Sequence, residues 1–245
     1  MTRLELIAVE GLPEVSPGND LGALISSRSE LKNGDILVVA QKVVSKSEGR
    51  LISLQAVTAG DEARRIAPNL IANPDPRMVQ VVLDESVRVL RSHRVLITET
   101  PHGFVCANSG VDHSNIPGDD VLTLLPKDPD ASADRLRLSL RELAGVEVGV
   151  IISDTFGRPW RLGIVNVALG IAGLPALVDL RGTTDDTGKP LHATVLAVAD
   201  DIAAAAGLVM GKTARTPAVI VRGFEIHGSG RGRDLVRPAA EDLFR

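Results

Sequence analysis

The chain has 245 residues, of which 44% are hydrophobic, 2% are aromatic and one is a cysteine, and its formal net charge is −4. This length allows one large domain or two small interlocked ones, with a core that must be aliphatic. The negative charge and the scarcity of aromatic side chains argue against a nucleic-acid partner, and a single cysteine leaves no internal disulfide and no thiolate zinc site.

No apolar run reaches the ~20 residues that a membrane-spanning helix needs, and the first residues lack the apolar core of a signal peptide. We therefore expect a cytoplasmic protein with no membrane partner. Cys106 lies in a strand-like apolar run, which favours a buried structural thiol over a catalytic one.

Hydrophobic periodicity and turn residues predict a mixture of strands and helices in the first half of the chain. Residues 77–93 fit a helix and a strand equally well. The other predicted elements are a strand over 4–12, a helix over 20–31 that Asp20 caps, a buried strand inside 33–49 whose end turns polar and basic, a helix over 58–71, and a hairpin over 94–115 that turns at 101–103.

The second half continues the mixture without a clean alternation of strand and helix. The predicted elements are a loop and then a capped helix over 117–145, a buried strand with a polar exit over 146–161, an apolar stretch rich in small residues over 162–182, an alanine-rich helix over 193–211 and a strand over 216–223. This order predicts an α+β fold with mixed sheets and flanking helices rather than a doubly wound one.

The stretch "AAAAGLVMGKT" fits a relaxed nucleotide-loop pattern, but its context is reversed. In a P-loop, a strand precedes the glycine-rich turn and a helix follows it. Here a predicted helix precedes Gly211 and a predicted strand follows, so we interpret Gly211 as a helix stop, with Lys212 near the negative end of the helix dipole.

Three clusters of polar residues follow predicted strands, where side chains are held rigidly and face solvent. The first cluster is Gln41, Lys42, Ser45, Lys46 and Glu48; the second is Asn108, Ser109, Gly110, Asp112, His113, Ser114 and Asn115; the third is Asp154, Thr155, Arg158, Trp160 and Arg161. The alternatives to a functional site are a solvated strand end for the first, an Asx-rich turn for the second and a surface loop for the third.

The chemistry of these clusters suits a divalent cation and a phosphate. Carboxylate and hydroxyl oxygens are the ligands of Mg²⁺ and Mn²⁺, and one or two carboxylates with phosphate oxygens complete a typical site. Lysine and arginine side chains neutralise phosphate. This combination predicts phosphoryl transfer or an NTP-dependent ligase. The rival from another class is a metal-independent binding module for an anionic small ligand.

Several segments resemble the coenzyme F-420-0:L-glutamate ligase, or gamma-glutamyl ligase, family. They are "GLPEVSPGNDLGALI", "GDILVVAQKVVSKSEGR", "CANSGVDHSN", "IISDTFGRPWRLGIVNVALGIAG" and "LVMGKT". The resemblance runs from about Leu4 to about Glu225, and the "SDTFGRPWR" and "NSGVD-SN" segments are the most specific.

The resemblance implies a gamma-glutamyl ligase-like α+β fold in an intertwined homodimer. It implies an enzyme that uses GTP as co-substrate and Mn²⁺ or Mg²⁺, with two ions expected and a monovalent cation as a further candidate. Its substrates would be F-420-0 and L-glutamate, joined first by an amide and then by gamma-glutamyl linkages.

The resemblance also assigns residues. It implies that the metal ligands are Asp112, Asp154 and Thr155. It implies that the nucleotide meets Leu12, Pro13, Glu14, Val15, Gln41, Lys42, Lys46, Asn115, Met210, Gly211, Lys212, Thr213, Ala214, Arg215, Thr216 and Pro217. Lys212 departs from the amide or acid expected in some relatives beside the second metal, and a charged lysine cannot be a metal ligand.

From their own chemistry, Arg158 and Arg161 are expected to hold the anionic F-420-0 tail or the incoming glutamate. His113 is a candidate acceptor for the amine proton, with water as the alternative. We expect residues 1–225 to form the ligase domain and 226–245 to be a flexible tail or linker toward a C-terminal flavin-binding domain. The alternative functions are a regulatory GTP-binding module and an amide ligase for another anionic cofactor.

Overall fold

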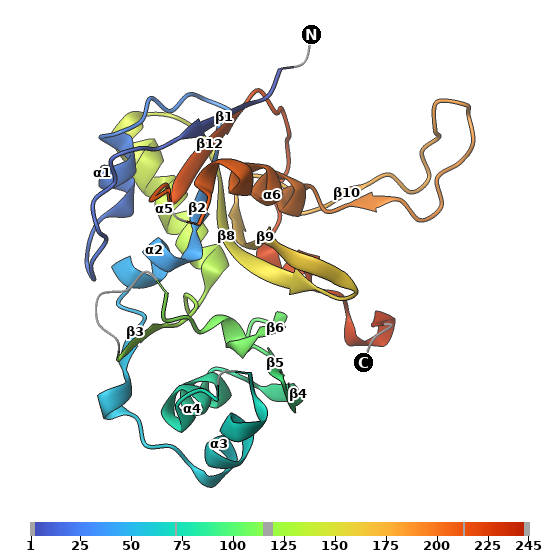
Figure 1. Ribbon diagram of the computed structural model, residues 1–245. Coiled ribbons are helices and arrows are strands. Elements are labelled where there is room, and N and C mark those ends of the chain that lie inside the picture. The colour runs from blue at the N-terminus through green and yellow to red at the C-terminus, as the bar shows by residue number, and fades with distance from the viewer. Residues whose placement is uncertain (1–2, 72, 115–119, 213, 243–245) are drawn as a thin grey trace.

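A computed structural model describes residues 3–71, 73–114, 120–212 and 214–242 (Figure 1). Its α-helices are α1 (Leu21–Ser26), α2 (Gln41–Ser47), α3 (Asp61–Ile66), α4 (Pro76–Asp84), α5 (Pro129–Ala144) and α6 (Val198–Met210). Its strands are β1 (Glu5–Ala8), β2 (Ile36–Ala40), β3 (Leu51–Ser53), β4 (Arg88–His93), β5 (Val95–Glu99), β6 (Val105–Ala107), β7 (Val121–Thr123), β8 (Gly149–Arg158), β9 (Arg161–Ala172), β10 (Val178–Asp179), β11 (Val195–Leu196) and β12 (Ala218–Arg222). The predicted α+β class with mixed sheets is confirmed.

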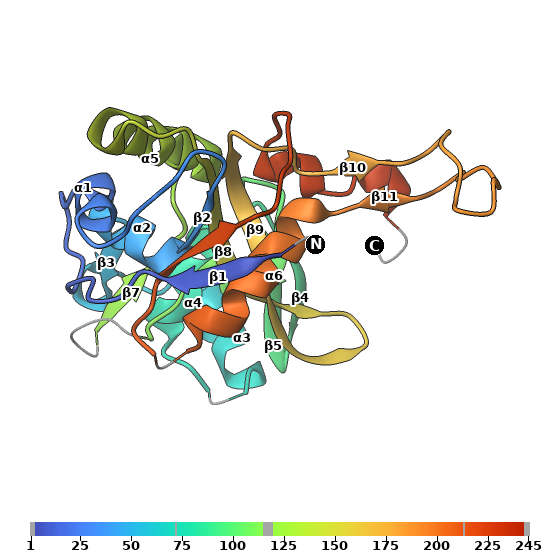
Figure 2. The same ribbon diagram turned by 90° about the horizontal axis from the view of Figure 1, so that it is seen from above.

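The largest sheet has five strands in the order β1-β12-β2-β8-β9. The pair β2 and β8 is parallel, and the other three neighbouring pairs are antiparallel. Helices α1 and α5 cover one face of this sheet, and α6 covers the other (Figures 1 and 2). The carboxyl ends of β2 and β8 therefore lie side by side at one edge of a three-layered unit.

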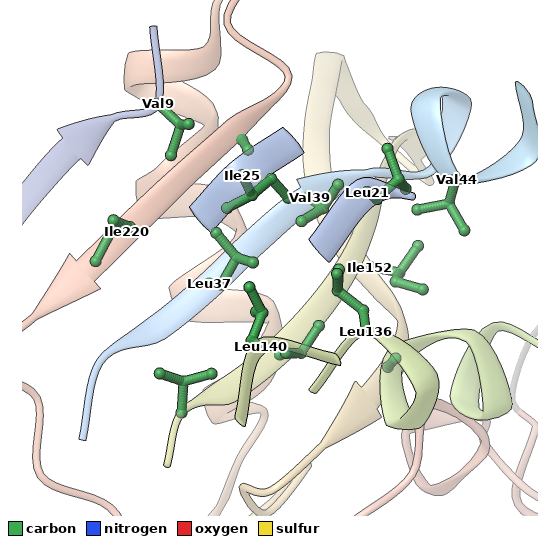
Figure 3. Close-up of a cluster of buried hydrophobic side chains, with 14 of the residues drawn as sticks. Val9, Leu21, Ile25, Leu37, Val39, Val44, Leu136, Leu140, Ile152 and Ile220 are labelled. Carbon is green, nitrogen blue, oxygen red and sulfur yellow. The ribbon is translucent and has the colours of Figure 1, made fainter. Parts of the chain in front are cut away.

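Successive side chains of the central strands point to opposite faces of this sheet, so apolar residues form a core on each face. On the α1 and α5 face, Leu37 and Val39 of β2 and Ile152 of β8 pack against Leu136 and Leu140 of α5 (Figure 3). The neighbouring residues of the same strands, such as Ile36, Val38 and Ile151, point to α6. Because both faces are covered, residues 36–40 of β2 and 150–152 of β8 are all apolar.

A smaller unit lies beneath the carboxyl ends of these strands in the view of Figure 1. It holds α3, α4, the three-stranded sheet β4-β5-β6 and the pair β3-β7 around a separate apolar core. The ambiguous residues 77–93 divide into α4 and β4, because Asp75 caps the helix and accepts a hydrogen bond from the Arg77 N–H. The predicted hairpin is confirmed as β5 and β6.

The C-terminal segment differs from the expected flexible linker. The main-chain N–H of Gly232 donates to the buried carboxylate of Asp130 at 2.7 Å, and Leu235 and Val236 pack against the two apolar cores beside β9. At Gly232 a Cβ would lie 1.9 Å from the carbonyl oxygen of Leu169, so only glycine permits this approach. The glycine at position 232 therefore allows the segment to pack closely against the main chain of β9. The expected C-terminal flavin-binding domain stays a prediction.

The segment between β9 and α6 extends away from the body as an arm that contains β10 and β11 (Figure 2). Within the described chain, no helix has both the length and the apolar character needed to cross a membrane. The homodimer is a prediction that a single chain does not test.

Candidate functional site

A cavity of about 680 Å³ lies at the carboxyl ends of β2 and β8, between the large sheet and the smaller unit. Its size falls in the usual range of small-molecule sites. The expected site residues that line it are Leu12, Pro13, Glu14, Val15, Gln41, Lys42, Lys46, Asp112, Asp154, Thr155, Met210, Gly211, Lys212, Arg215, Thr216 and Pro217. Five segments that are far apart in the sequence thus meet at one edge of the sheet.

Helix α2 presents the first group of cationic side chains. The helix starts at Gln41, directly after β2, so the polar residues that were expected at the end of a strand lie on a helix instead. Lys42 and Lys46 are therefore one helical turn apart. Lys46 is buried and forms an ion pair with Glu14. Gln41 is also buried, and its side-chain carbonyl accepts a hydrogen bond from the Ser45 hydroxyl at 2.8 Å.

Asp112 comes from the smaller unit. Its main chain pairs with Thr123 through two hydrogen bonds, which fixes the residue beside β7. Its carboxylate accepts hydrogen bonds from Lys42 Nζ at 2.7 Å and from the Ser114 N–H at 2.7 Å. Burial alone would raise the pKa of Asp112, but the hydrogen bonds from Lys42 and Ser114 outweigh it and leave the pKa below its ordinary value.

Asp154 and Thr155 lie on β8 just beyond the point where the strand meets the end of β2. A register shift between Ile152 and Ser153 marks this point, and such bulges commonly re-aim side chains beside active sites. Burial raises the pKa of Asp154 to about 6, and the Thr155 N–H and the charges of Lys212 and Lys42 act in the opposite direction. The negative charge of Asp112 adds to the rise.

Lys212 reaches the cavity from the end of α6. The helix ends at Met210, Gly211 has φ of 55°, and Lys212 Nζ donates to Thr155 Oγ1 at 2.7 Å. Strand β12 follows at Ala218, so the order of helix, glycine and strand is the reverse of a P-loop, as predicted. The "GKT" segment therefore meets the cavity by another geometry.

The sequence interpretation missed two polar residues that line the cavity, Ser153 and Asn166. Asn166 lies opposite Thr155 in the β8–β9 register, and its Nδ2 donates to Ser153 Oγ at 3.1 Å. Ser153 directly precedes the predicted site residue Asp154, so its place in the sequence was enough to predict it. Asn166 is set in an apolar run and reaches the site only through strand pairing.

Some predicted residues do not reach the cavity in this chain. Arg158 and Arg161 are exposed at the tip of the hairpin between β8 and β9, where a continuing pair of strands replaces the expected loop. His113 is exposed beside Asp112, and neither it nor Ala214 lines the cavity. Asn115 and Thr213 lie outside the described residues. The catalytic roles of the two arginines and the histidine stay predictions.

Cys106 is buried, and burial raises the pKa of its thiol to about 12. A thiol with such a pKa holds its proton at neutral pH, so it is a poor nucleophile. The expectation of a structural cysteine is thus supported by its surroundings.

The cavity is cationic in a chain whose net charge is negative. Four cationic side chains and three carboxylates line it: Lys42, Lys46, Lys212 and Arg215 against Glu14, Asp112 and Asp154. In the described part of the chain, no three His, Cys, Asp or Glu side chains gather into a protein-only metal cage. Two carboxylates and a hydroxyl fit a hard cation that takes its remaining oxygen ligands from a phosphate, as Mg²⁺ commonly does.

Comparison with known proteins supports the family resemblance found in the sequence. A model of the family described as F420-0:Gamma-glutamyl ligase matches residues 11–223. The Coenzyme F420:L-glutamate ligase of Methanothermobacter thermautotrophicus is 45% identical over 99% of both chains, and that of Methanopyrus kandleri is 45% identical over 100% of both. The protein of that name from Methanocaldococcus jannaschii is 42% identical over 99% of this chain and 97% of its own.

These matches confirm the family resemblance found in the sequence and the expectation that the chain is an enzyme, a ligase. They extend through every segment that lines the cavity, because residues 12–217 fall inside the matched range. The chain belongs to the F420-0:Gamma-glutamyl ligase family.

Proposed function

We propose that this chain is a GTP- and divalent-metal-dependent ligase that adds L-glutamate to F-420-0. The observation that carries the proposal is the cationic cavity, in which two carboxylates and a threonine hydroxyl face lysines from two separate segments. The names of the family and of the relatives point to F-420-0 and L-glutamate as the substrates, and the residues expected to meet a nucleotide point to GTP as the co-substrate.

Asp112, Asp154 and Thr155 would hold the metal ion. Their oxygens suit Mg²⁺ or Mn²⁺, and burial raises the pKa of Asp154 to about 6 although the charges of Lys212 and Lys42 oppose the rise. A bound divalent ion would add further positive charge beside this carboxylate and neutralise phosphate oxygens. We propose two ions, with Lys212 in place of an acidic or amide ligand beside the second, and a monovalent cation as a further candidate.

The chain's own cationic side chains would bind the triphosphate. Lys42 and Lys46 lie one helical turn apart, and Lys212 lies at the end of α6, so the three charges approach from two sides. The segment from Leu12 to Val15 would close the nucleotide site, because the Glu14–Lys46 ion pair ties it to α2. These groups position the reactants and neutralise charge, which is the main protein contribution to phosphoryl transfer.

A carboxylate does not react directly with an amine, because oxide is a poor leaving group. In the proposed reaction, a carboxylate oxygen of F-420-0 attacks the gamma phosphorus of GTP, the bond to the beta-phosphate oxygen breaks, and GDP leaves. The amine of glutamate then attacks the acyl phosphate, inorganic phosphate leaves with the bonding electrons, and the amine loses a proton. Further glutamates would add through gamma linkages by the same steps.

The proposal is tested by incubating the chain with GTP, MnCl₂, F-420-0 and L-glutamate and measuring the mass of the product by mass spectrometry. We expect a mass gain of one or more glutamyl residues, one GDP for each, and no gain when any reactant is omitted. Release of GDP without a glutamyl product would point to another anionic acceptor. Nucleotide binding with no GDP release would favour the regulatory module.

The metal assignment has its own variants. Asp112→Asn and Asp154→Asn should each lower the turnover at least about a hundredfold while the far-UV circular dichroism stays unchanged, because a neutral amide is a poor ligand for a hard cation. Asp179→Asn is the matched control, because Asp179 is exposed and pairs with Arg181 on the arm. Near-normal turnover in both cavity variants would remove these residues as ligands.

We also infer a homodimer. The tip of the β8–β9 hairpin carries Leu162, which is 99% exposed, and Ile164, which is 57% exposed. A second copy that covers them would remove apolar surface from water. Light scattering should give twice the chain mass, and Leu162→Glu should shift it toward the monomer, whereas the mass of one chain in the wild type would contradict the dimer.

A further inference from the structure

The carboxylate of Asp112 has little remaining capacity to accept a ligand. Its Oδ1 accepts the Ser114 N–H at 2.7 Å, and its Oδ2 accepts both Lys42 Nζ at 2.7 Å and the Ser114 hydroxyl at 2.9 Å. A carboxylate offers about four lone-pair positions, so three are in use. A cation that binds this carboxylate must take the last position beside an ammonium group or displace a donor.

Lys42 is equally committed. Its ammonium has three N–H groups, and it makes three hydrogen bonds: to Asp112 Oδ2, to the Ser114 hydroxyl at 2.7 Å and to the Ser114 carbonyl at 3.1 Å. Its side chain is 19% exposed, so solvent screens the pair only in part. The lysine is thus both the counterion of Asp112 and the group that a phosphate in the cavity would attract.

The other side of the cavity repeats this arrangement. Lys212 Nζ donates to Thr155 Oγ1 at 2.7 Å, and Thr155 is the hydroxyl expected to join Asp154 as a ligand. Oxygens on both sides of the cavity are therefore held by ammonium groups from α2 and from the end of α6. A divalent cation beside either ammonium would meet like charge at short range.

We propose that Lys42 is a positioning residue that exchanges partners, so that nucleotide binding makes Asp112 available to the metal ion. Phosphate oxygens take the ammonium of Lys42, Asp112 loses its counterion, and the divalent cation binds in its place. Nucleotide and metal then bind with positive coupling, and each raises the affinity of the other by the same factor. This inference rests on the proposed function, because it takes a polyphosphate and a divalent cation as the ligands.

The first test measures Mn²⁺ binding to the nucleotide-free protein by the electron paramagnetic resonance signal of free Mn²⁺. Omitting nucleotide avoids the Mn²⁺ that GTP itself binds. Lys42→Gln should bind Mn²⁺ about tenfold more tightly than the wild type, because the amide releases Asp112. Lys42→Met, which keeps the length of the stem, replaces this variant if it does not fold.

Removing any positive charge from the cavity favours a cation, so the control must remove charge without releasing Asp112. Lys46→Gln does this, because Lys46 lines the same cavity and pairs with Glu14. We expect at most about a threefold gain in Mn²⁺ affinity for Lys46→Gln. Lys32→Gln, on the exposed Lys32–Glu30 pair, should change nothing. An equal gain in Lys42→Gln and Lys46→Gln would overturn the inference, because net charge would then explain both.

The second test measures GTP affinity by calorimetry in EDTA. Lys42→Gln should weaken GTP binding about tenfold while it strengthens Mn²⁺ binding, and these opposite directions are the signature of a shared partner. A variant that weakens both ligands would show a merely structural role and overturn the exchange.

The outcomes separate this inference from the proposed ligase activity. Glutamyl product from the wild type with no Mn²⁺ gain in Lys42→Gln would leave the ligase standing and remove the exchange. No glutamyl product with the opposite shifts intact would support the exchange for another acceptor substrate. Failure of both proteins to bind Mn²⁺ at millimolar concentration would overturn the exchange.

Discussion

Two aspartates that face the same cavity have opposite electrostatic environments. Asp112 is paired with Lys42, and its pKa is lowered, whereas burial raises the pKa of Asp154 to about 6. A group whose pKa falls on folding stabilises the folded state above its unfolded pKa, and that stability is lost as the pH falls through the folded value. A group whose pKa rises on folding stabilises the protein at low pH, and that contribution is lost as the pH increases through the folded value.

The metal-free protein should therefore respond in opposite ways to two similar substitutions. At pH 8, Asp154→Asn should raise the free energy of unfolding by about 2 kcal/mol, because it removes a negative charge that folding has taken out of water. This figure is smaller than the full pKa shift would give, because the side chain is partly exposed and solvent screens its charge. The gain should vanish below pH 4, where both states are protonated. Thermal unfolding in EDTA from pH 4 to 8 measures this, and a loss of stability at pH 8 would contradict it.

Asp112→Asn should show the opposite sign. It removes the carboxylate that Lys42 and Ser114 stabilise, so it should lower the melting temperature at pH 8, with a difference that shrinks as the pH falls through the lowered pKa of Asp112. The same EDTA melts, extended below pH 4, supply the comparison. Equal shifts for Asp112→Asn and Asp154→Asn would show that their environments do not differ as described.

The sequence predicted the identity of most cavity residues but not the contacts between them. Residue type and position after a strand were enough to select Lys42, Asp112 and Asp154. Their pairing depends on the way the smaller unit folds back over the ends of β2 and β8, across 70 residues between Lys42 and Asp112. Asn166 could not be found this way, because strand register alone brings it to the site.

Among the elements, α6 approaches β9 closely at one glycine, Gly207. A Cβ at Gly207 would lie 2.6 Å from Asn166 Oδ1 and 3.2 Å from Asn166 Cβ. The Asn166 amide is held by Ser153 and lies 3.8 Å from the Met210 sulfur, so it cannot swing aside without losing these partners. Helix propensity favours alanine over glycine by about 1 kcal/mol, and here packing opposes that preference.

Gly207→Ala should therefore destabilise the wild type and stabilise a variant that lacks the Asn166 side chain. In the Asn166→Gly background, which lacks both the amide group and Cβ, the clash is gone, and the propensity gain of about 1 kcal/mol should appear. Urea unfolding of the four proteins of this double-mutant cycle measures the change of sign. A stabilising Gly207→Ala in both backgrounds would show that the contact does not constrain α6.

Elements with strong local signals were the predictable ones. Asp20 accepts the Ala23 N–H as the predicted helix cap, and the hairpin at 101–103 and the end of α6 at Gly211 follow from turn residues and glycine. The start of α2 was missed because Ala40 supplies no side-chain cap, so no local signal separates it from β2. Residues 77–93 were ambiguous because a helix and a strand share one apolar pattern.

At the scale of the whole molecule, the C-terminal segment shows how composition can mislead. "GSGRGR" has the glycine and arginine content of a linker, yet Gly230 and Gly232 approach the main chain at Ala176 and Leu169 too closely for any side chain. Asp130 of α5 accepts N–H groups from both Ile171 of β9 and Gly232. One buried carboxylate therefore joins a helix, the edge strand of the large sheet and the C-terminal segment.

A chain that ends at residue 227 should be measurably less stable than the full chain. It loses the Gly232 hydrogen bond, the Arg231–Asp134 ion pair and the apolar cover that Leu235 and Val236 give to β9. We expect a loss of about 3 kcal/mol, or roughly 6–12 °C in melting temperature for a protein of this size. Calorimetry of this truncation measures the loss.

The matched control is a chain that ends at residue 238, which keeps Gly232 and Val236 and removes only the residues beyond them. It should melt within about 2 °C of the full chain, because surface changes away from such contacts have small effects. Gly232→Ala in the full chain should reproduce much of the loss, since its Cβ would meet a backbone carbonyl that cannot move aside. If the chain ending at residue 227 had the same melting temperature as the full chain, the segment would behave as the linker that its composition suggests. The packing against β9 would then contribute nothing to stability.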